Sequence, residues 1–278
     1  MVERTEFLTT GPAEGIAGLL DLPLPEVETG AGLPLLWHWV YLLPRPAQAD
    51  LDPAGHALMA GVPAEPDRRR MWAGGRVRTS GALLCGRPAT RRTLVAAVRE
   101  KTGRSGRLTF VTISHQIIQD ERLVIDEEQD LVYRDAAPTA VPEAAPVPPV
   151  PDQPLPRQEH EWEIETSSSL LFRFSALTYN GHRIHYDRDY TRDVEGYPGL
   201  LVHGPLQALA MAEAARRERD PGPGPGVIGL TFDYRLVSPL FDHQGLIVSA
   251  VKDDDGFSTA VRDRTGRRTA AGTLRPNR

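Results

Sequence analysis

Apolar and polar residues alternate in short stretches of both halves of this chain, a pattern typical of half-buried β-strands. Polar or glycine-containing turns separate neighbouring stretches and indicate hairpins, at residues 103–106, 119–122, 253–256 and 264–267. The stretches themselves are residues 76–80, 93–102, 107–120, 123–134, 227–236, 245–252, 257–264 and 269–274. The chain is therefore predicted to form an antiparallel meander twice.

Helical periodicity is strongest in two segments. Residues 12–22 carry apolar side chains at helical spacing, and residues 205–219 do so over a longer stretch. The longer segment begins with a proline, which is favoured in a first helical turn, and a proline–glycine run at 221–226 ends it. For the aromatic-rich residues 33–44, periodicity cannot distinguish helix from strand, so both stay possible.

A proline- and alanine-rich stretch at residues 136–158 separates two parts of similar length, 1–135 and 159–278. We expect it to run extended as a linker. In each part, helical and irregular material is followed by an antiparallel meander, and a helix can cover the apolar face of such a sheet. The predicted fold class is α+β: a double hotdog, in which two antiparallel sheets are each wrapped around a central helix.

The composition is that of a soluble globular protein, with 278 residues of which 40% are hydrophobic and 25% charged. A net charge of -5 argues against a nucleic-acid-binding face. The single cysteine, Cys85, excludes a disulfide framework and favours a reducing compartment. The first residues do not resemble a signal peptide, and no apolar run approaches the ~20 residues of a membrane span. We expect a cytoplasmic protein without nucleic-acid or membrane partners.

The candidate chemistry is concentrated in two nearby segments of the second half. Residues 180–187 place an amide, two imidazoles and a carboxylate within eight positions, directly after an apolar run. Residues 200–206 form a turn that opens the longer predicted helix. We interpret the first segment as the source of proton chemistry and the second as a group that polarises a carbonyl. A polar loop whose histidines only satisfy the local backbone is the alternative.

These two segments resemble the MaoC-like enoyl-thioester hydratases and dehydratases, hotdog enzymes that often carry two such units in one chain. In their usual signature an Asp is followed two residues later by an Asn and three residues after that by a His. Here Asn180 replaces the Asp, His182 replaces the Asn, and His185 matches the final His. The mesaconyl-C4-CoA (3-methylfumaryl-CoA) hydratases and the mitochondrial-type 3-hydroxyacyl-thioester dehydratases share this departure.

The resemblance covers most of the chain. It includes residues 172–187, 195–200 and 202–206 of the second half, and the first half contributes residues 36–39, 70–75 and 110–112. It implies a non-catalytic first hotdog of the fatty-acid-synthase-like dehydratase type and a catalytic MaoC-like second hotdog. The implied activity is that of a hydro-lyase acting on the double bond of an enoyl thioester.

Hydration of such a thioester needs a base for water, a proton for C2 and a donor for the enolate oxygen. We expect His185 to be the general base, and the acid in the reverse direction. Asn180 can only donate or accept hydrogen bonds, so we expect it to hold water or substrate. The backbone N–H of Gly204, at the start of a helix, is suited to the enolate charge. The candidates for further proton transfer or substrate binding are His182, Tyr186, Asp187 and His203.

A C4-dicarboxylyl thioester, such as mesaconyl-C4-CoA, carries a free carboxylate that requires a cation, ideally an arginine. By sequence, the nearest candidates are Arg183 and Arg192. Four aromatic residues of the first half are expected in its core rather than against the ligand: Trp37, His38, Trp39 and Trp72. The first half could still line the acyl pocket or bind the CoA.

Two other functions stay open. One is a 3-hydroxyacyl dehydratase acting on carrier-protein thioesters in fatty-acid or polyketide synthesis, with an acyl carrier protein as partner. The other is a thioester-binding protein that has lost turnover through Asn180. No metal or cofactor is expected beyond the CoA or phosphopantetheine of the substrate, because residues 182–187 lack a recognised metal signature. Both a monomer and a homodimer are compatible with a double hotdog.

Overall fold

The computed structural model describes residues 1–57, 68–103, 106–135, 155–218 and 228–277. Most of the predicted linker at 136–158 and the proline–glycine run at 221–226 lie outside these residues. In the described part of the chain, no helix is long and apolar enough to cross a membrane.

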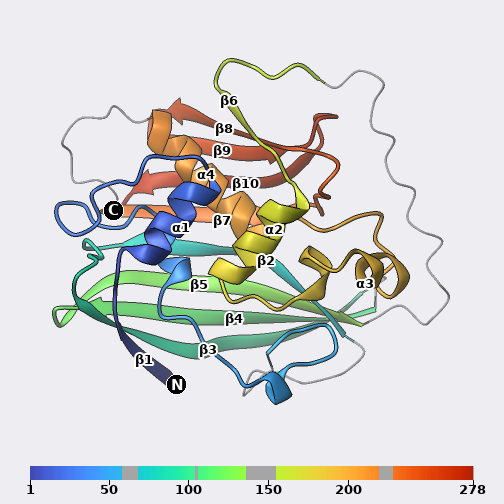
Figure 1. Ribbon diagram of the computed structural model, residues 1–278, viewed down its shortest axis with the longest axis horizontal. Coiled ribbons are helices and arrows are strands. Elements are labelled where there is room, and N and C mark those ends of the chain that lie inside the picture. Colours follow the sequence, from blue (N-terminus) through green and yellow to red (C-terminus); the bar gives the residue numbers. More distant parts are fainter. Residues whose placement is uncertain (58–67, 104–105, 136–154, 219–227, 278) are drawn as a thin grey trace.

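The described residues contain ten strands, which form one continuous antiparallel sheet (Figure 1). Their order across the sheet is β1-β3-β4-β5-β2-β7-β10-β9-β8-β6. The five strands of the first half are β1 (Val2–Phe7), β2 (Arg68–Thr79), β3 (Pro88–Gly103), β4 (Gly106–Gln119) and β5 (Arg122–Asp135). Those of the second half are β6 (Glu161–Ile164), β7 (Leu230–Leu236), β8 (Leu246–Asp253), β9 (Gly256–Arg262) and β10 (Arg268–Pro276).

The two halves join where β2 pairs with β7, between residues 74–78 and 231–235. Each half keeps the meander that the sequence predicts, since β3, β4 and β5 are consecutive neighbours and so are β8, β9 and β10. The structure therefore has one sheet where the sequence predicts two. The strands β2 and β7 pair with each other, which satisfies backbone groups that would otherwise be unpaired at the edge of each half.

The helices α1, α2 and α4 lie on one face of this sheet (Figure 1). The α-helices of the described residues are α1 (Gly11–Leu19), α2 (Ser168–Leu177), α3 (Arg188–Asp193) and α4 (Gly204–Glu218), and short 3-10 turns occur at η1 (Trp37–Val40), η2 (Gln48–Asp50) and η3 (Arg183–His185). Helix α4 packs on β8, β9 and β10 and is buried along most of its length. It is the long hotdog helix predicted for the second half.

The first half has a much shorter cover. Its helix α1 has 9 residues, against 15 for α4, and packs on α2 and η1. The aromatic segment at 33–44 is neither a strand nor an α-helix but contains η1. In the described residues the larger apolar cluster runs through both halves and includes the buried side chains of Trp37, Phe174 and Phe232. A second, small cluster lies in the first half.

Candidate active site

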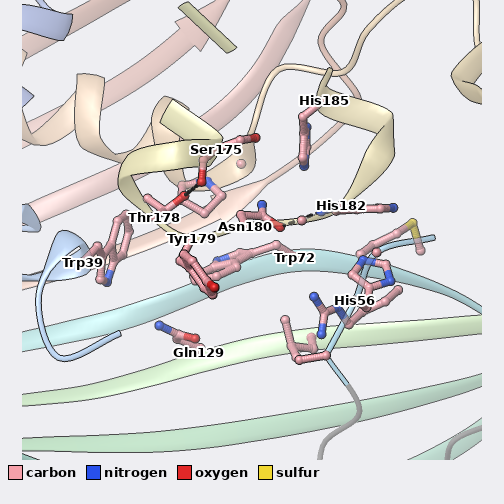
Figure 2. Close-up of a pocket in the computed structure, with 18 of the residues that line it drawn as sticks. Trp39, His56, Trp72, Gln129, Ser175, Thr178, Tyr179, Asn180, His182 and His185 are labelled. Carbon is pink, nitrogen blue, oxygen red and sulfur yellow. Dashed lines mark hydrogen bonds between the residues drawn. The ribbon is translucent and has the colours of Figure 1, made fainter. Parts of the chain in front are cut away.

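A cavity of about 1450 Å³ is shared by the two halves of the chain. The first half lines it with residues of β1 to β5 and of the segment 38–57. The second half contributes the end of α2, the loop 178–186, the start of α4 and residues 236–240. Figure 2 shows Asn180, His182 and His185 of this loop, with His56 and Trp72 of the first half close to them.

The end of helix α2 places Asn180 in the cavity. The Asn180 N–H donates to the Ser175 carbonyl at 2.8 Å, and Tyr179 between them has a left-handed backbone with φ 51°. This reversal resembles a Schellman helix end, where glycine is the usual residue. A non-glycine residue there carries local backbone strain, of the kind that concentrates at functional sites.

The Asn180 side chain is oriented by the backbone of His182, two residues further along the loop. Its Oδ1 accepts the N–H of His182 at 3.1 Å, so the orientation of the amide is fixed. The NH₂ group of Asn180 can therefore donate to a water molecule or a substrate oxygen in the cavity.

His185 is held as a neutral base. Its Nδ1 lies 2.8 Å from the Leu201 carbonyl oxygen, which can only accept, so Nδ1 carries the proton and Nε2 has the free lone pair. Burial is the main cause that lowers the pKa of His185, to about 4, and the charge of Arg70 acts in the same direction. At neutral pH this imidazole is therefore ready to accept a proton.

His203 lies behind His185 rather than in the cavity. The two rings stack with centroids 3.7 Å apart, and the Nε2 of His203 is 2.8 Å from the Ser175 hydroxyl. His203 is fully buried, and burial keeps its pKa well below the ordinary value for histidine. It supports the ring of His185 and does not form part of the cavity lining.

A second histidine pair joins the two halves. The rings of His182 and His56 have centroids 3.7 Å apart, and both side chains line the cavity. His56 also contacts Asp52, through its backbone N–H at 2.8 Å and its ring Nδ1 at 3.4 Å. Burial lowers the pKa of both histidines, that of His56 to about 3. The sequence analysis did not identify His56, because nothing near it in the chain marks a site.

Residues 51–57, the loop that carries His56, contact the loop 178–186 and hold it in place. The Arg183 N–H donates to the Ala54 carbonyl at 2.9 Å. Gly55 has φ 89°, and a side chain at that position would collide with the carbonyl of Gly181. Only glycine combines this conformation with such a close approach.

Gly204 is the first residue of α4 and lines the cavity. The first backbone N–H groups of a helix have no intrahelical acceptor, so they are available to a negatively charged oxygen. A Cβ at Gly204 would meet the end of the Leu236 side chain, so a larger residue there would require that side chain to move.

The two arginines predicted to bind the substrate carboxylate, Arg183 and Arg192, do not line the cavity. Arg183 pairs with Asp187 at 2.8 Å and stacks on Tyr190, while Arg192 is largely exposed and pairs with Asp189 and Asp193. Neither arginine lines the cavity, and neither does Asp187, which caps α3 by accepting the Tyr190 N–H. These three assignments are wrong for geometric reasons, because sequence proximity to His185 does not bring the side chains to the same side of the loop.

The remaining predicted residues differ in their placement. Tyr186 lines the cavity and donates its hydroxyl to the Gly181 carbonyl at 2.8 Å. Trp37 is a core residue that donates to Glu213. The other three aromatic residues of the first half, which the sequence analysis assigned to the core, line the cavity: His38, Trp39 and Trp72. In the described residues, no three His, Cys, Asp or Glu side chains are grouped as a metal site requires.

The family profile of the type 2 hydroxyacyl-thioester dehydratases (Htd2) matches residues 36–242, most of the chain. The chain belongs to this family. A mesaconyl-C(4)-CoA hydratase of Chloroflexus aurantiacus is 45% identical over 228 residues, which are 81% of this chain and 77% of that protein. The mitochondrial hydroxyacyl-thioester dehydratase type 2 of Schizosaccharomyces pombe is 30% identical over 125 residues, 45% of this chain and 38% of that protein.

Solved structures agree on the fold at low sequence identity. HtdX of Mycobacterium tuberculosis has a TM-score of 0.67 at 14% identity, covering 99% of this chain and 100% of that one. A MaoC-like dehydratase of Phytophthora capsici has a TM-score of 0.66 at 14% identity, covering 100% and 96%. A further M. tuberculosis protein described as a double hotdog has a TM-score of 0.51 at 15% identity, covering 98% and 93%. The predicted double hotdog and the predicted family, whose named members are lyases, are both confirmed.

Proposed function

We propose that this protein adds water across the double bond of an enoyl-CoA whose acyl group is a C4-dicarboxylate, such as mesaconyl-C4-CoA. The observation that carries the chemistry is the fixed tautomer of His185, whose Nδ1 donates to Leu201 and whose Nε2 is left as a base. The relative named mesaconyl-C(4)-CoA hydratase, at 45% identity, supports this acyl group.

In the proposed hydration, the Asn180 NH₂ group positions a water molecule and the Nε2 of His185 removes one of its protons. The C3–O bond forms as the double bond shifts its electrons towards the thioester oxygen. C2 then takes a proton, which restores the thioester. We assign this second transfer to His185 as well, because Asn180 cannot carry a proton and Asp187 lies outside the cavity.

The transient enolate needs a donor that is already in place. With the thioester oxygen at the Gly204 N–H, the first turn of α4 provides that donor and the positive end of a helix dipole. Such a donor acts on the charge only as it develops, so it accelerates the reaction rather than only tightening binding.

The part of the cavity that is lined by the first half contains polar groups, and these favour a short, polar acyl group. Glu127 is buried there and accepts from Trp39 at 2.8 Å and Gln129 at 2.7 Å, while the imidazole of His38 lies 2.9 Å from it. Arg91 also lines this arm, and its Nε is buried without a partner. A long alkyl chain would offer no partner to the Arg91 guanidinium and would desolvate its charge further, at a cost of roughly 1–3 kcal/mol.

The carrier-protein dehydratase of fatty-acid synthesis is therefore the second candidate, and the non-catalytic binder is the third. The binder would require no base, yet His185 is buried and oriented as one. No cofactor takes part in the proposed steps, and CoA enters only as part of the substrate.

The test is the loss of absorbance of the conjugated enoyl-thioester band. We expect the protein to hydrate mesaconyl-C4-CoA with a kcat/KM at least tenfold above that for crotonyl-CoA. A His185→Gln variant should be folded and nearly inactive. Absence of turnover with every enoyl-CoA and enoyl-carrier substrate would overturn the catalytic assignment, and a preference for crotonyl-CoA would overturn the dicarboxylyl one.

A further inference from the structure

The cavity contains an arginine, Arg70, to which the mechanism above gives no function. It lies on β2 two residues before Trp72, so the two side chains share one face of the strand, and both line the cavity. Arg70 is half-buried, and desolvation of its guanidinium lowers its pKa. Its hydrogen-bond partner is the side chain of Tyr133, its register partner on β5.

Arg70 differs in its charge balance from Arg69, its neighbour on β2, and from Arg183 of the loop 178–186. Arg69 is paired with Glu195 at 2.9 Å and Arg183 with Asp187 at 2.8 Å. Among the described residues, no carboxylate lies within ion-pair distance of Arg70, and the acid whose charge it does feel, Asp52, is engaged by His56. A partly desolvated cation without a counterion favours the binding of an anion.

Arg70 lies close enough to the histidines that line the cavity for its charge to act on them. The charge of Arg70 is among the causes that lower the pKa values of His56, His182 and His185, so all three rings lie within its electrostatic reach. Because these rings stay neutral, they do not compete with Arg70 for the anion. A phosphate of CoA is not available here, since the pantetheine arm separates it from a thioester held at Gly204.

A C4-dicarboxylyl thioester carries its free carboxylate on C3, the carbon that water attacks beside His185. We propose that Arg70 binds this carboxylate and selects a dicarboxylyl over a simple acyl substrate. This inference rests on the proposed function. The planar guanidinium can donate two parallel hydrogen bonds to a carboxylate, which also fixes the rotation of C3 relative to the base. Arg70 thereby takes the function that the sequence analysis gave to Arg183 and Arg192.

The experiment compares fumaryl-CoA with crotonyl-CoA, two C4 thioesters in which a carboxylate replaces a methyl group on C3. We expect Arg70→Met to reduce kcat/KM for fumaryl-CoA and mesaconyl-C4-CoA by roughly 10²–10³-fold, because an interface charge pair is lost. For crotonyl-CoA the change should stay within about fivefold. Arg192→Met is the matched control, since Arg192 is paired and lies outside the cavity. It should leave both values unchanged.

Arg70→Lys provides a second test. It keeps the positive charge but removes the planar guanidinium that can donate two parallel hydrogen bonds. It should lower kcat/KM for fumaryl-CoA about tenfold and leave crotonyl-CoA unaffected. Equal losses on both substrates in either folded variant would overturn the inference and give Arg70 a structural role. If Arg70→Met does not fold, Arg70→Lys decides on the same criterion.

Succinyl-CoA and butyryl-CoA, as unreactive inhibitors, test the wild-type site. Succinyl-CoA should inhibit at least tenfold more strongly in the wild type, and this advantage should disappear in Arg70→Lys or Arg70→Met. A wild-type protein that hydrates crotonyl-CoA and rejects the dicarboxylyl substrates would contradict the proposed function itself. A wild type that prefers dicarboxylyl substrates, with variants that keep the preference, would contradict only the assignment to Arg70.

Discussion

The two halves of the sheet are covered differently, and this difference determines where the cavity lies. In the second half, helix α4 has 15 residues and fills the face of β8, β9 and β10 with buried side chains. In the first half, helix α1 has 9 residues and packs on α2 and η1 instead. The cavity therefore extends over β2 to β5, where the face of the sheet is less completely covered.

In the proposed reaction, catalysis and recognition are separated between the halves. The second half supplies Asn180, His185 and Gly204, the groups of the proposed reaction. The first half supplies His56 and Arg70, which surround the same space but belong to the other hotdog unit. The first half is thus not a passive copy, although it carries no base in the proposed reaction. Duplicated folds can diverge in this way when one copy keeps the catalytic residues and the other changes the residues that line the cavity.

The largest expected effect is on kcat, and it should differ between a histidine of the second half and one of the first half. His185→Gln should lower kcat about 10³-fold, because a general base contributes roughly 10²–10⁴-fold. His56→Gln should lower it about tenfold, through the orientation of His182. Steady-state kinetics on one preparation of each variant, with circular dichroism to confirm folding, would measure both. A larger loss for His56→Gln than for His185→Gln would reverse the proposed division of labour.

The second prediction concerns acid stability. His185 has a pKa of about 4 in the folded chain and about 6.5 when unfolded, so the unfolded chain takes up the proton first as the pH falls. Stability should therefore decrease from pH 6.5 towards pH 4, by about 2 kcal/mol for His185 alone at pH 5. Urea unfolding at pH 7.5 and 5 measures this loss. In His185→Gln the loss should be smaller by that amount, and an equal loss would show that this histidine does not titrate as described.

The same pKa predicts the activity profile. Because the base form of His185 is the active one, kcat/KM should be independent of His185 ionisation at neutral pH and should fall only as the pH approaches about 4. Rapid assays started from neutral stock solution would separate this fall from slow acid unfolding. A fall centred near pH 6.5 would indicate a solvent-exposed base instead.

The fourth prediction tests the contact between the halves. Gly55→Ala should destabilise the protein by about 2 kcal/mol and lower kcat roughly tenfold, because the new Cβ displaces the Gly181 carbonyl and with it the catalytic loop. Gly30→Ala is a matched control, since Gly30 also has positive φ but open space around it. It should cost only about 1 kcal/mol and leave kcat unchanged. Equal effects on kcat would show that the loop contact does not position the site.

Much of the fold could be predicted from the sequence, because the signals for strands, turns and helix starts lie within short stretches of the chain. Alternation of apolar and polar residues marked the long strands of both meanders, and the proline at 205 marked the start of α4 within one residue. Strand β1 escaped prediction because most of its side chains are exposed on the sheet edge. The apolar run before Asn180 proved to be helix α2, capped by Ser167.

The site could be predicted only in its contiguous part. Asn180, His182 and His185 lie in one short segment, so a motif reveals them. His56 and Arg70 lie more than 100 residues away in the sequence and reach the site through the β2–β7 pairing and the docked 51–57 loop. Arg183 was closer in sequence, but its spacing of four residues from Asp187 favours a local ion pair over the cavity.

The smallest expected effect concerns strain in the catalytic half. Tyr179 adopts φ 51° at the end of α2, and its ring is about half exposed. Tyr179→Gly and Tyr179→Ala both remove the ring, but only glycine relieves the left-handed conformation, so Tyr179→Gly should be about 1 kcal/mol more stable than Tyr179→Ala. Urea unfolding of the two variants measures the difference. Because Asn180 follows directly, relief of strain should also loosen its orientation, and kcat for the glycine variant should fall about twofold below that of the alanine variant. Equal stabilities would mean that the chain pays nothing for this turn, and that the Ser175–Asn180 hydrogen bond alone sets the position of the amide.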